Sequence, residues 1–239
     1  MKKIILTLLL STVSIVNAQK WNRQKISESG HKITTQRITP SYEEIGVSGS
    51  FEVNLIAGKV GEIAITADEN IIPYIITEVK NNQLSIYFEK NKNINNHSKI
   101  TIEVPFENLK TIQLVGSGNI TSKNTIVTNN LNVHLTGSGD ISLDVQTTSI
   151  TTSVSGSGDV NMKGTSTDIN ATVIGSGEID VDQLKSDNAT VDVNGSGDIK
   201  LFCTKKLLAV VAGSGTIHYK GKPEMVEKTV AGSGDIKSY

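Results

Sequence analysis

The chain has 239 residues, of which 37% are hydrophobic and only 4% aromatic, with 21 glycines and a formal net charge of -1. This composition favours many short strands joined by turns around a thin aliphatic core. With a near-neutral charge and no basic cluster, nucleic acid is not an expected partner. The single cysteine, Cys203, excludes an intramolecular disulfide, and we expect it to be a small buried side chain.

The N-terminus has the residue order of a secretory signal peptide. Two lysines precede an apolar run from Ile4 to Val16, and small residues up to Ala18 suit a cleavage site. We expect residues 1–18 to be removed, although an uncleaved anchor is the alternative. No later stretch reaches the roughly 20 apolar residues that span a bilayer, so no transmembrane segment is expected after cleavage. The protein is therefore expected to be exported to the periplasm, the cell surface or the medium.

The segment before the repeats is predicted to be mostly β. Residues 19–40 are largely polar and without periodicity, which predicts an extended leader. From Ile45 onward, apolar and polar residues alternate in short runs that are typical of strands. Residues 68–79 are a helix candidate, although an internal proline limits it to a short first turn or a loop. Residues 91–98, rich in Asn and Lys, are expected to form an exposed loop.

A Gly-Ser-Gly triplet recurs seven times in residues 111–239, at intervals of 18 to 21 residues. A period this regular indicates a solenoid, in which each repeat buries its apolar face against its neighbours. Glycine suits a corner that needs positive φ or a close backbone approach. The predicted turn glycines are Gly116, Gly118, Gly137, Gly139, Gly156, Gly158, Gly175, Gly177, Gly195, Gly197, Gly213, Gly215, Gly232 and Gly234.

Apolar columns appear when the seven copies are aligned on the first glycine. Leu or Val stands two residues before it in every copy, and Ile or Val four residues after it. Because these offsets are even, each arm alternates as a strand with one buried face does. The sequence predicts an all-β domain over 41–239, a parallel β-helix or solenoid. About seven ~19-residue coils are expected over 111–239, each closed by a polar run such as 146–149, with an N-terminal β region over 41–110 that continues or caps them.

The repeated Gly-Ser-Gly-Asp/Asn-Ile motif resembles a bacterial family called putative auto-transporter adhesin, head GIN domain. The run from Ile45 to Val53 is similar to the family's Ile-x-Val-x-Gly-x-Phe-x-Val start. The resemblance covers about residues 40–239. It implies a β-helical fold and a role in adhesion, with no catalytic residues.

One outward column carries the strongest candidate for ligand chemistry. The residue after the second glycine is acidic in five of the seven copies, and stacked neighbours about 4.8 Å apart repel one another. Carboxylates suit Ca²⁺, so weak cation binding is one hypothesis. The favoured alternative is that these side chains bond to their own turn backbone, with Lys200 and Lys237 as counter-charges. The candidate metal ligands are Asp140, Asp159, Glu178 and Asp198.

No other cofactor and no catalytic residue is predicted, because the Gly-Ser-Gly triplet lacks the spacing of a nucleophile elbow. The sequence favours a non-enzymatic exported module that binds carbohydrate or protein at the cell surface, or its own copies. One alternative is a polysaccharide-degrading β-helix enzyme, although repeats of such even length leave no long loops to build a groove. The other is a purely structural envelope protein.

Overall fold

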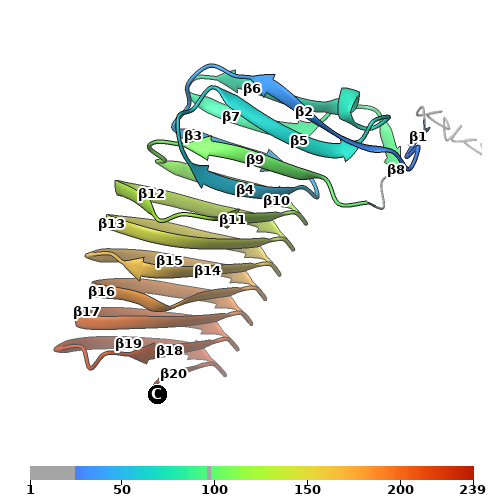
Figure 1. Cartoon of the computed structure of the whole chain (residues 1–239). Coiled ribbons are helices and arrows are strands. Elements are labelled where there is room, and N and C mark those ends of the chain that lie inside the picture. Colours follow the sequence, from blue (N-terminus) through green and yellow to red (C-terminus); the bar gives the residue numbers. More distant parts are fainter. Residues whose placement is uncertain (1–24, 96–97) are drawn as a thin grey trace, which may run out of the picture.

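The computed structural model describes residues 25–95 and 98–239, so the expected signal peptide lies outside the described residues. The fold is a β-solenoid, as predicted, with its coils stacked below an N-terminal cap (Figure 1). Within the described ranges, no helix is long and apolar enough to cross a membrane.

Each coil of the repeat region has two arms, a first arm that ends at the Gly-Ser-Gly corner and a second arm that follows it. Equivalent arms of successive coils pair in parallel, with the first glycine of one corner opposite that of the next. The strands are β10 (Thr111–Gly116), β11 (Asn119–Ser122), β12 (Ile126–Gly137), β13 (Asp140–Gly156), β14 (Asp159–Thr165), β15 (Asp168–Gly175), β16 (Glu178–Gly195), β17 (Asp198–Gly213), β18 (Thr216–Lys220), β19 (Met225–Gly232) and β20 (Asp235–Ser238).

The core is the set of aliphatic columns at the even offsets. Val173 and Ile179, which flank one corner, are completely buried, and their equivalents in the other coils are buried too, except in β19. There Val226 and Val230 are 37% and 45% exposed. Each fully buried Val, Leu or Ile contributes about 1.5–3 kcal/mol relative to exposure, so the stacked columns supply most of the stability.

The two glycines of each corner meet two different constraints. The first glycine of every triplet has φ between +120° and +133°, where a side chain is strained. The second glycine lies against the preceding coil: a Cβ on Gly197 would be 2.2 Å from the carbonyl oxygen of Gly177. The corner backbone also joins the hydrogen-bond ladder, since Ser196 N–H donates to the Gly175 carbonyl at 2.8 Å.

At the second corner, the predicted polar run 146–149 is present but is part of a strand. Residues 146–149 lie inside β13, which is continuous around the bend. Residues 126–128 and 130 of β12 pair with this part of β13. The strand continues through this corner in β13, β16 and β17, whereas it is interrupted between β14 and β15 and between β18 and β19.

Small buried side chains line this second corner and satisfy its carbonyl groups. Ser166 Oγ donates to the Asp168 carbonyl at 2.9 Å, and Ser186 Oγ donates to the Phe202 carbonyl at 2.6 Å. Cys203 pairs in register with Ser186, and its thiol contacts the Lys206 carbonyl at 3.1 Å. Burial raises the pKa of the Cys203 thiol, so this side chain packs the corner instead of serving as a reactive thiolate.

An additional coil precedes the seven that the triplets mark. Strands β3 (Glu44–Ser48) and β4 (Glu52–Ala57) pair in parallel with β10 and β11. Their corner reads Gly49-Ser50-Phe51, so a phenylalanine replaces the second glycine. Phe51 is fully buried, with its ring centroid 4.6 Å from that of Phe88. The triplet pattern missed this coil because an aromatic side chain fills the place of the glycine.

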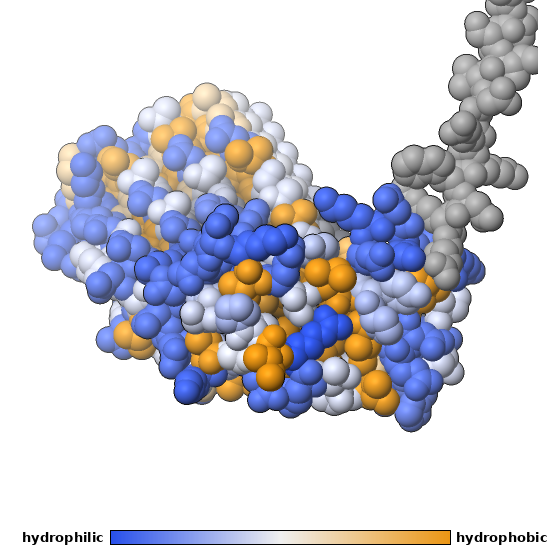
Figure 2. Space-filling view, turned by 90° about the horizontal axis from the view of Figure 1, so that it is seen from above, coloured by the Kyte–Doolittle hydropathy of each residue, from blue (hydrophilic) through white to orange (hydrophobic). Residues whose placement is uncertain are grey.

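The cap begins with parallel strands and ends with antiparallel ones. Strands β7 (Gln83–Phe88) and β9 (Thr101–Phe106) extend the two arms in parallel, and β6 (Ile75–Lys80) and β5 (Glu62–Asp68) then pair with them antiparallel. Seen from this end, hydrophobic side chains form small patches between hydrophilic ones (Figure 2). The N-terminal region therefore both continues and caps the solenoid.

Two N-terminal predictions, the leader and the loop, need correction. The expected leader at 19–40 contains β1 (Lys25–Ser27) and β2 (Lys32–Ile38), and β2 pairs antiparallel with β5 along its whole length. Most β2 side chains are exposed, which removes the alternation that marks a strand. The helix candidate at 68–79 is limited, as its proline predicted, to one 3₁₀ turn, η1 (Ile72–Tyr74), which leads into β6. The expected loop at 91–98 contains β8 (Asn93–Asn95), which pairs with β1.

We predict that Gly197→Ala destabilises the protein by about 3 kcal/mol, because the new Cβ meets the backbone of the preceding coil. Thermal melting followed by circular dichroism should show a fall of about 10 °C. The matched control is Gly58→Ala, since a Cβ there meets nothing within 4 Å. Equal melting temperatures for the two variants would contradict this account of the corner.

We predict that Thr152→Val stabilises the protein by about 1 kcal/mol. Thr152 is 1% exposed in the core, in register with Val133 and Ala171, and its hydroxyl has no hydrogen-bond partner. Valine keeps the shape and removes the unsatisfied hydroxyl. The melting temperature should rise by about 3 °C, whereas the exposed neighbour variant Thr151→Val should change it little. A decrease for Thr152→Val would show that the hydroxyl is satisfied.

Candidate functional site

The two arms give the solenoid two outward faces of different chemistry. The uncharged face consists of the residues one, three and five positions before the first glycine of each triplet, and its only charged members are Asp192 and Glu227. The charged face consists of the residues three, five and seven positions after that glycine. It carries Lys123, Asp140, Asp144, Asp159, Lys163, Glu178, Asp180, Asp182, Asp198, Lys200, Lys220, Asp235 and Lys237.

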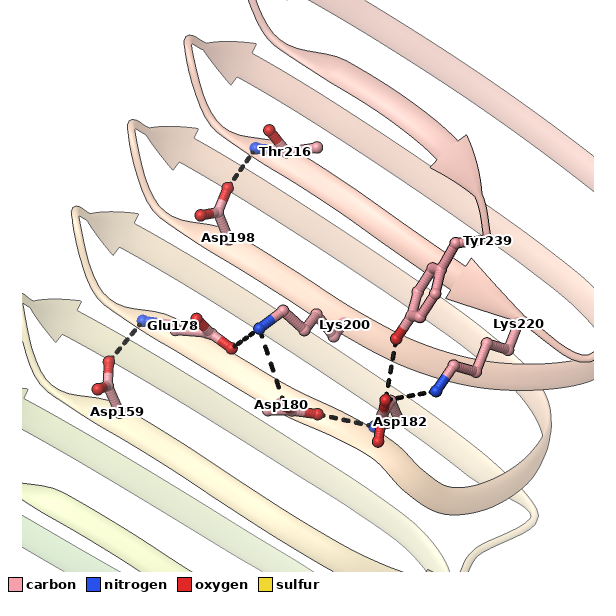
Figure 3. Close-up of polar contacts among 9 residues, drawn as sticks. All are labelled: Asp159, Glu178, Asp180, Asp182, Asp198, Lys200, Thr216, Lys220 and Tyr239. Carbon is pink, nitrogen blue, oxygen red and sulfur yellow. Dashed lines mark hydrogen bonds and ion pairs between the residues drawn. The ribbon is translucent and has the colours of Figure 1, made fainter.

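Contacts between coils hold the acidic column of the charged face (Figure 3). Asp159 Oδ1 accepts a hydrogen bond from the N–H of Glu178 at 3.1 Å, and Asp198 Oδ1 accepts one from the N–H of Thr216 at 2.9 Å. Glu178 Oε1 lies 2.6 Å from Lys200 Nζ. Two of these carboxylates therefore bond to the backbone of the following coil and not to their own turn. Asp235 does accept a hydrogen bond from the adjacent Ile236 N–H, and Lys200 and Lys237 are counter-charges in the column, as predicted. These bonds and the lysines offset the repulsion within the column.

The four predicted metal ligands do not gather around one point. Three of them, Asp159, Glu178 and Asp198, make the bonds just given, and Asp140 is exposed in the same column. Across residues 25–95 and 98–239, no group of three or more His, Cys, Asp or Glu side chains could hold a metal ion together. Cation binding by this column stays a prediction.

Asp182 on the charged face contacts side chains from more distant coils. Its Oδ2 lies 2.6 Å from Lys220 Nζ and 3.0 Å from the hydroxyl of Tyr239, two and three coils further on (Figure 3). The hydrogen bond from Lys220 holds the pKa of Asp182 below its usual range. Asp182 lies at a bulge in β16, between Val181 and Lys185. The bulge accommodates an extra residue and gives this coil its 20-residue spacing.

The uncharged face is a continuous parallel sheet, with β7, β3 and β10 followed by the first arms of β12, β13, β15, β16, β17 and β19. On β3 its outward residues include a further charged side chain, Glu44. Its outward side chains are mainly Thr, Ser, Asn and Gln, whose hydroxyl and amide groups both donate and accept hydrogen bonds. Within the repeat coils, the side-chain hydrogen bonds made by this face involve Asn132, His134 and Ser153. Most of its polar groups are therefore available to a partner.

Exposed apolar side chains lie among the polar ones on the uncharged face. Val115, Ile174 and Val210 are 38%, 53% and 37% exposed. The sequence prediction that binding belongs to outward residues did not separate the two faces. The signal that separates them is the near absence of charge one, three and five residues before each triplet.

A family model described as "putative auto-transporter adhesin, head GIN domain" matches residues 41–223. A putative adhesin from Bacteroides fragilis is 27% identical with a TM-score of 0.84, over 90% of this chain and 100% of that one. A putative lipid binding protein from Parabacteroides distasonis is 26% identical with a TM-score of 0.78, over the same shares. A putative adhesin from Parabacteroides merdae, 21% identical with a TM-score of 0.74 over 90% and 99%, shares the fold. No curated protein matches the chain.

We predict that Asp182→Asn lowers the melting temperature at pH 7 by about 2 °C, because it removes the ion pair with Lys220. The folded-state pKa of Asp182 is depressed below 3.8, so its ionised form stabilises the fold above that pH. This stabilisation is lost as the pH falls through the folded-state pKa. The difference between variant and wild type should therefore close progressively below pH 3.8.

The control for this measurement is Asp192→Asn on the uncharged face, since Asp192 forms no ion pair within the described part of the chain. Asp192→Asn should have the same melting temperature as the wild type at pH 7 and below pH 3.8. A pH-independent loss in Asp182→Asn would show that the ion pair is not the source of the effect.

Proposed function

Because the chain belongs to the family described as putative auto-transporter adhesin, head GIN domain, we propose that it is a non-enzymatic adhesion module of the bacterial cell envelope. It is exported by the predicted N-terminal signal peptide and contacts its partner through the uncharged face. Two similar structures, from Bacteroides fragilis and Parabacteroides merdae, are also described as putative adhesins.

The observation that carries this proposal is the segregation of charge between the two faces. Mixed charges over the whole surface favour solubility, and the charged face has them. The uncharged face lacks them over many stacked strands, although it is equally open to solvent. Burying neutral hydroxyl and amide groups costs far less than burying charges, and the cores of interfaces are depleted in charge. An uncharged strip with exposed Val115, Ile174 and Val210 is suited to contact with a partner.

The scaffold beneath this face favours binding by lowering its entropic cost. The inward residues of the same strands, such as Val154 and Val173, are completely buried, so the backbone is fixed before any contact is made. The outward side chains are short, and short side chains lose little rotamer freedom when they become immobilised. A partner therefore meets groups that are already in place.

The charged face does not favour the alternative of a polysaccharide-degrading enzyme. A glycosidase needs a carboxyl group with a raised pKa to protonate the leaving oxygen. Asp182 has a lowered pKa beside Lys220, and Glu178 is paired with Lys200. These carboxylates support inter-coil contacts instead of general acid catalysis.

We predict that Thr151→Lys weakens binding to a polysaccharide ligand about fivefold, because a charge is placed in the middle of the uncharged face. Wild type and variant are compared on a printed array of neutral and acidic polysaccharides, and unsaturated products and new reducing ends are assayed in parallel. The matched control is Ser142→Lys, which lies on the same strand, β13, but on the charged face.

Binding that is retained in Thr151→Lys but lost in Ser142→Lys would show that the binding site lies on the charged face. Turnover of any polysaccharide would overturn the non-enzymatic assignment. Binding of the wild type to phospholipid vesicles, with none to polysaccharides, would favour a lipid partner such as the description of the Parabacteroides distasonis protein names.

A further inference from the structure

The uncharged face is hollowed at its N-terminal end, over β3. The hollow has a volume of about 590 Å³. Its floor includes the small residues Gly46 and Ser48 of β3 and Ser85 of β7, and its sides include Tyr87 of β7 and Gln113 and Val115 of β10. We call this hollow the β3 trough.

The trough follows from the strand register. Gly46 lies opposite Ser85 on one side and Gln113 on the other, and Ser48 lies between Tyr87 and Val115. Paired strands are about 4.8 Å apart, so the flanking strands β7 and β10 are about 10 Å apart. Because β3 has small outward residues, the depression is centred on this strand, and it widens toward β7 at Ser85. Its lining residues on β7 extend from Gln83 to Phe88, which gives the trough a length of about 17 Å.

The side wall of the trough at β7 is a fixed, neutral aromatic ring. The Tyr87 hydroxyl donates to Glu78 Oε1 at 2.8 Å, and Glu78 Oε2 lies 2.7 Å from Lys80 Nζ. The hydrogen bond to Glu78 raises the pKa of Tyr87, so its phenol is neutral at pH 7. The charge of Glu78 is balanced by Lys80. The wall therefore presents an aromatic ring whose polar end is already satisfied.

Amides and hydroxyls complete the lining. The side chains of Gln83 and Gln113 line the trough, as do Ser48 and Ser85. In the described part of the chain, neither glutamine side chain makes a hydrogen bond within the protein, so their amides are available to donate and accept. An aromatic ring packs against the C–H groups of a sugar, and amides and hydroxyls match its hydroxyl groups.

We propose that the β3 trough binds a segment of a neutral polysaccharide chain laid along β3. This rests on the proposed function and names its partner. The elongated shape favours an oligosaccharide segment over a single sugar ring. The balanced Glu78 and Lys80 pair favours a neutral chain over an acidic one. Lys90 also lines the hollow, is exposed and would pair with an acidic chain, so this residue tests whether the partner is neutral.

The test fills the trough without disturbing the fold. Gly46 lies within β3 and has no positive φ, and a Cβ there would meet only the side-chain amide of Gln83, at 3.0 Å from Nε2. That amide is the end of a flexible side chain and can move. Gly46→Val should therefore fold with an unchanged melting temperature. We expect its affinity for the neutral polysaccharides of the array to fall at least tenfold.

Four companion variants sharpen the result. Gly58→Val is the matched control, because its Cβ meets nothing within 4 Å, and it should bind like the wild type. Tyr87→Phe keeps the ring and should retain binding, whereas Tyr87→Ala should lose it. Lys90→Ala should bind neutral chains unchanged.

The outcomes separate this inference from the proposed function. If Gly46→Val binds like the wild type while Thr151→Lys has lost affinity, the trough is not the binding site and the uncharged face still is. Binding restricted to acidic chains and lost in Lys90→Ala overturns the neutral partner. A further outcome is that the wild type binds no polysaccharide of the array and adheres to a protein or a vesicle through the uncharged face. In that case the proposed polysaccharide site is wrong, and the proposed adhesion function still holds.

Discussion

The whole structure depends on one constraint: backbones of successive coils must approach to about 4.8 Å at every position, including the corners. Straight arms meet this condition easily, because their side chains point to either side of the sheet. A corner meets it only where no Cβ stands between the two backbones. The Gly-Ser-Gly triplet provides this, since the first glycine takes the left-handed turn and the second, such as Gly197, lies against a carbonyl group.

Because the coils stack closely, few types of residue fit at the inward positions of the solenoid, whereas many types fit at the outward positions. Inward positions are limited to Val, Ile, Leu and a few small residues, since each contacts the same position in the coils above and below. Outward positions can change without affecting the stack. The two faces could therefore acquire different chemistry: ion pairs such as Glu178 with Lys200 tie coils together on one, and hydroxyls and amides cover the other. The β3 trough belongs to the second face.

Much of the fold could be predicted because its rules are local and repeated. The even offsets around each triplet predict both arms and the core. The coil at β3 and β4 could not be recognised from the triplet, because Phe51 replaces the glycine and packs on Phe88. Strand β2 carries too few buried residues to show its period. The contact between Asp182 and Tyr239 and the trough over Gly46 join residues far apart in sequence, and no repeat specifies such pairs.

The antiparallel cap also affects whether further chains can add strands to the N-terminal end of the stack and form a fibre. A stack of identical parallel rungs is geometrically close to the core of an amyloid fibril, and a bare rung would template further strands. At the N-terminal end, β5 and β6 reverse the strand direction and β2 covers β5. Arg37 of β2 then ties this layer down through the Ile72 and Ile75 carbonyls. An incoming rung meets reversed strands that carry Lys32, Arg37 and Lys80, and these charges disfavour fibrous propagation from that end.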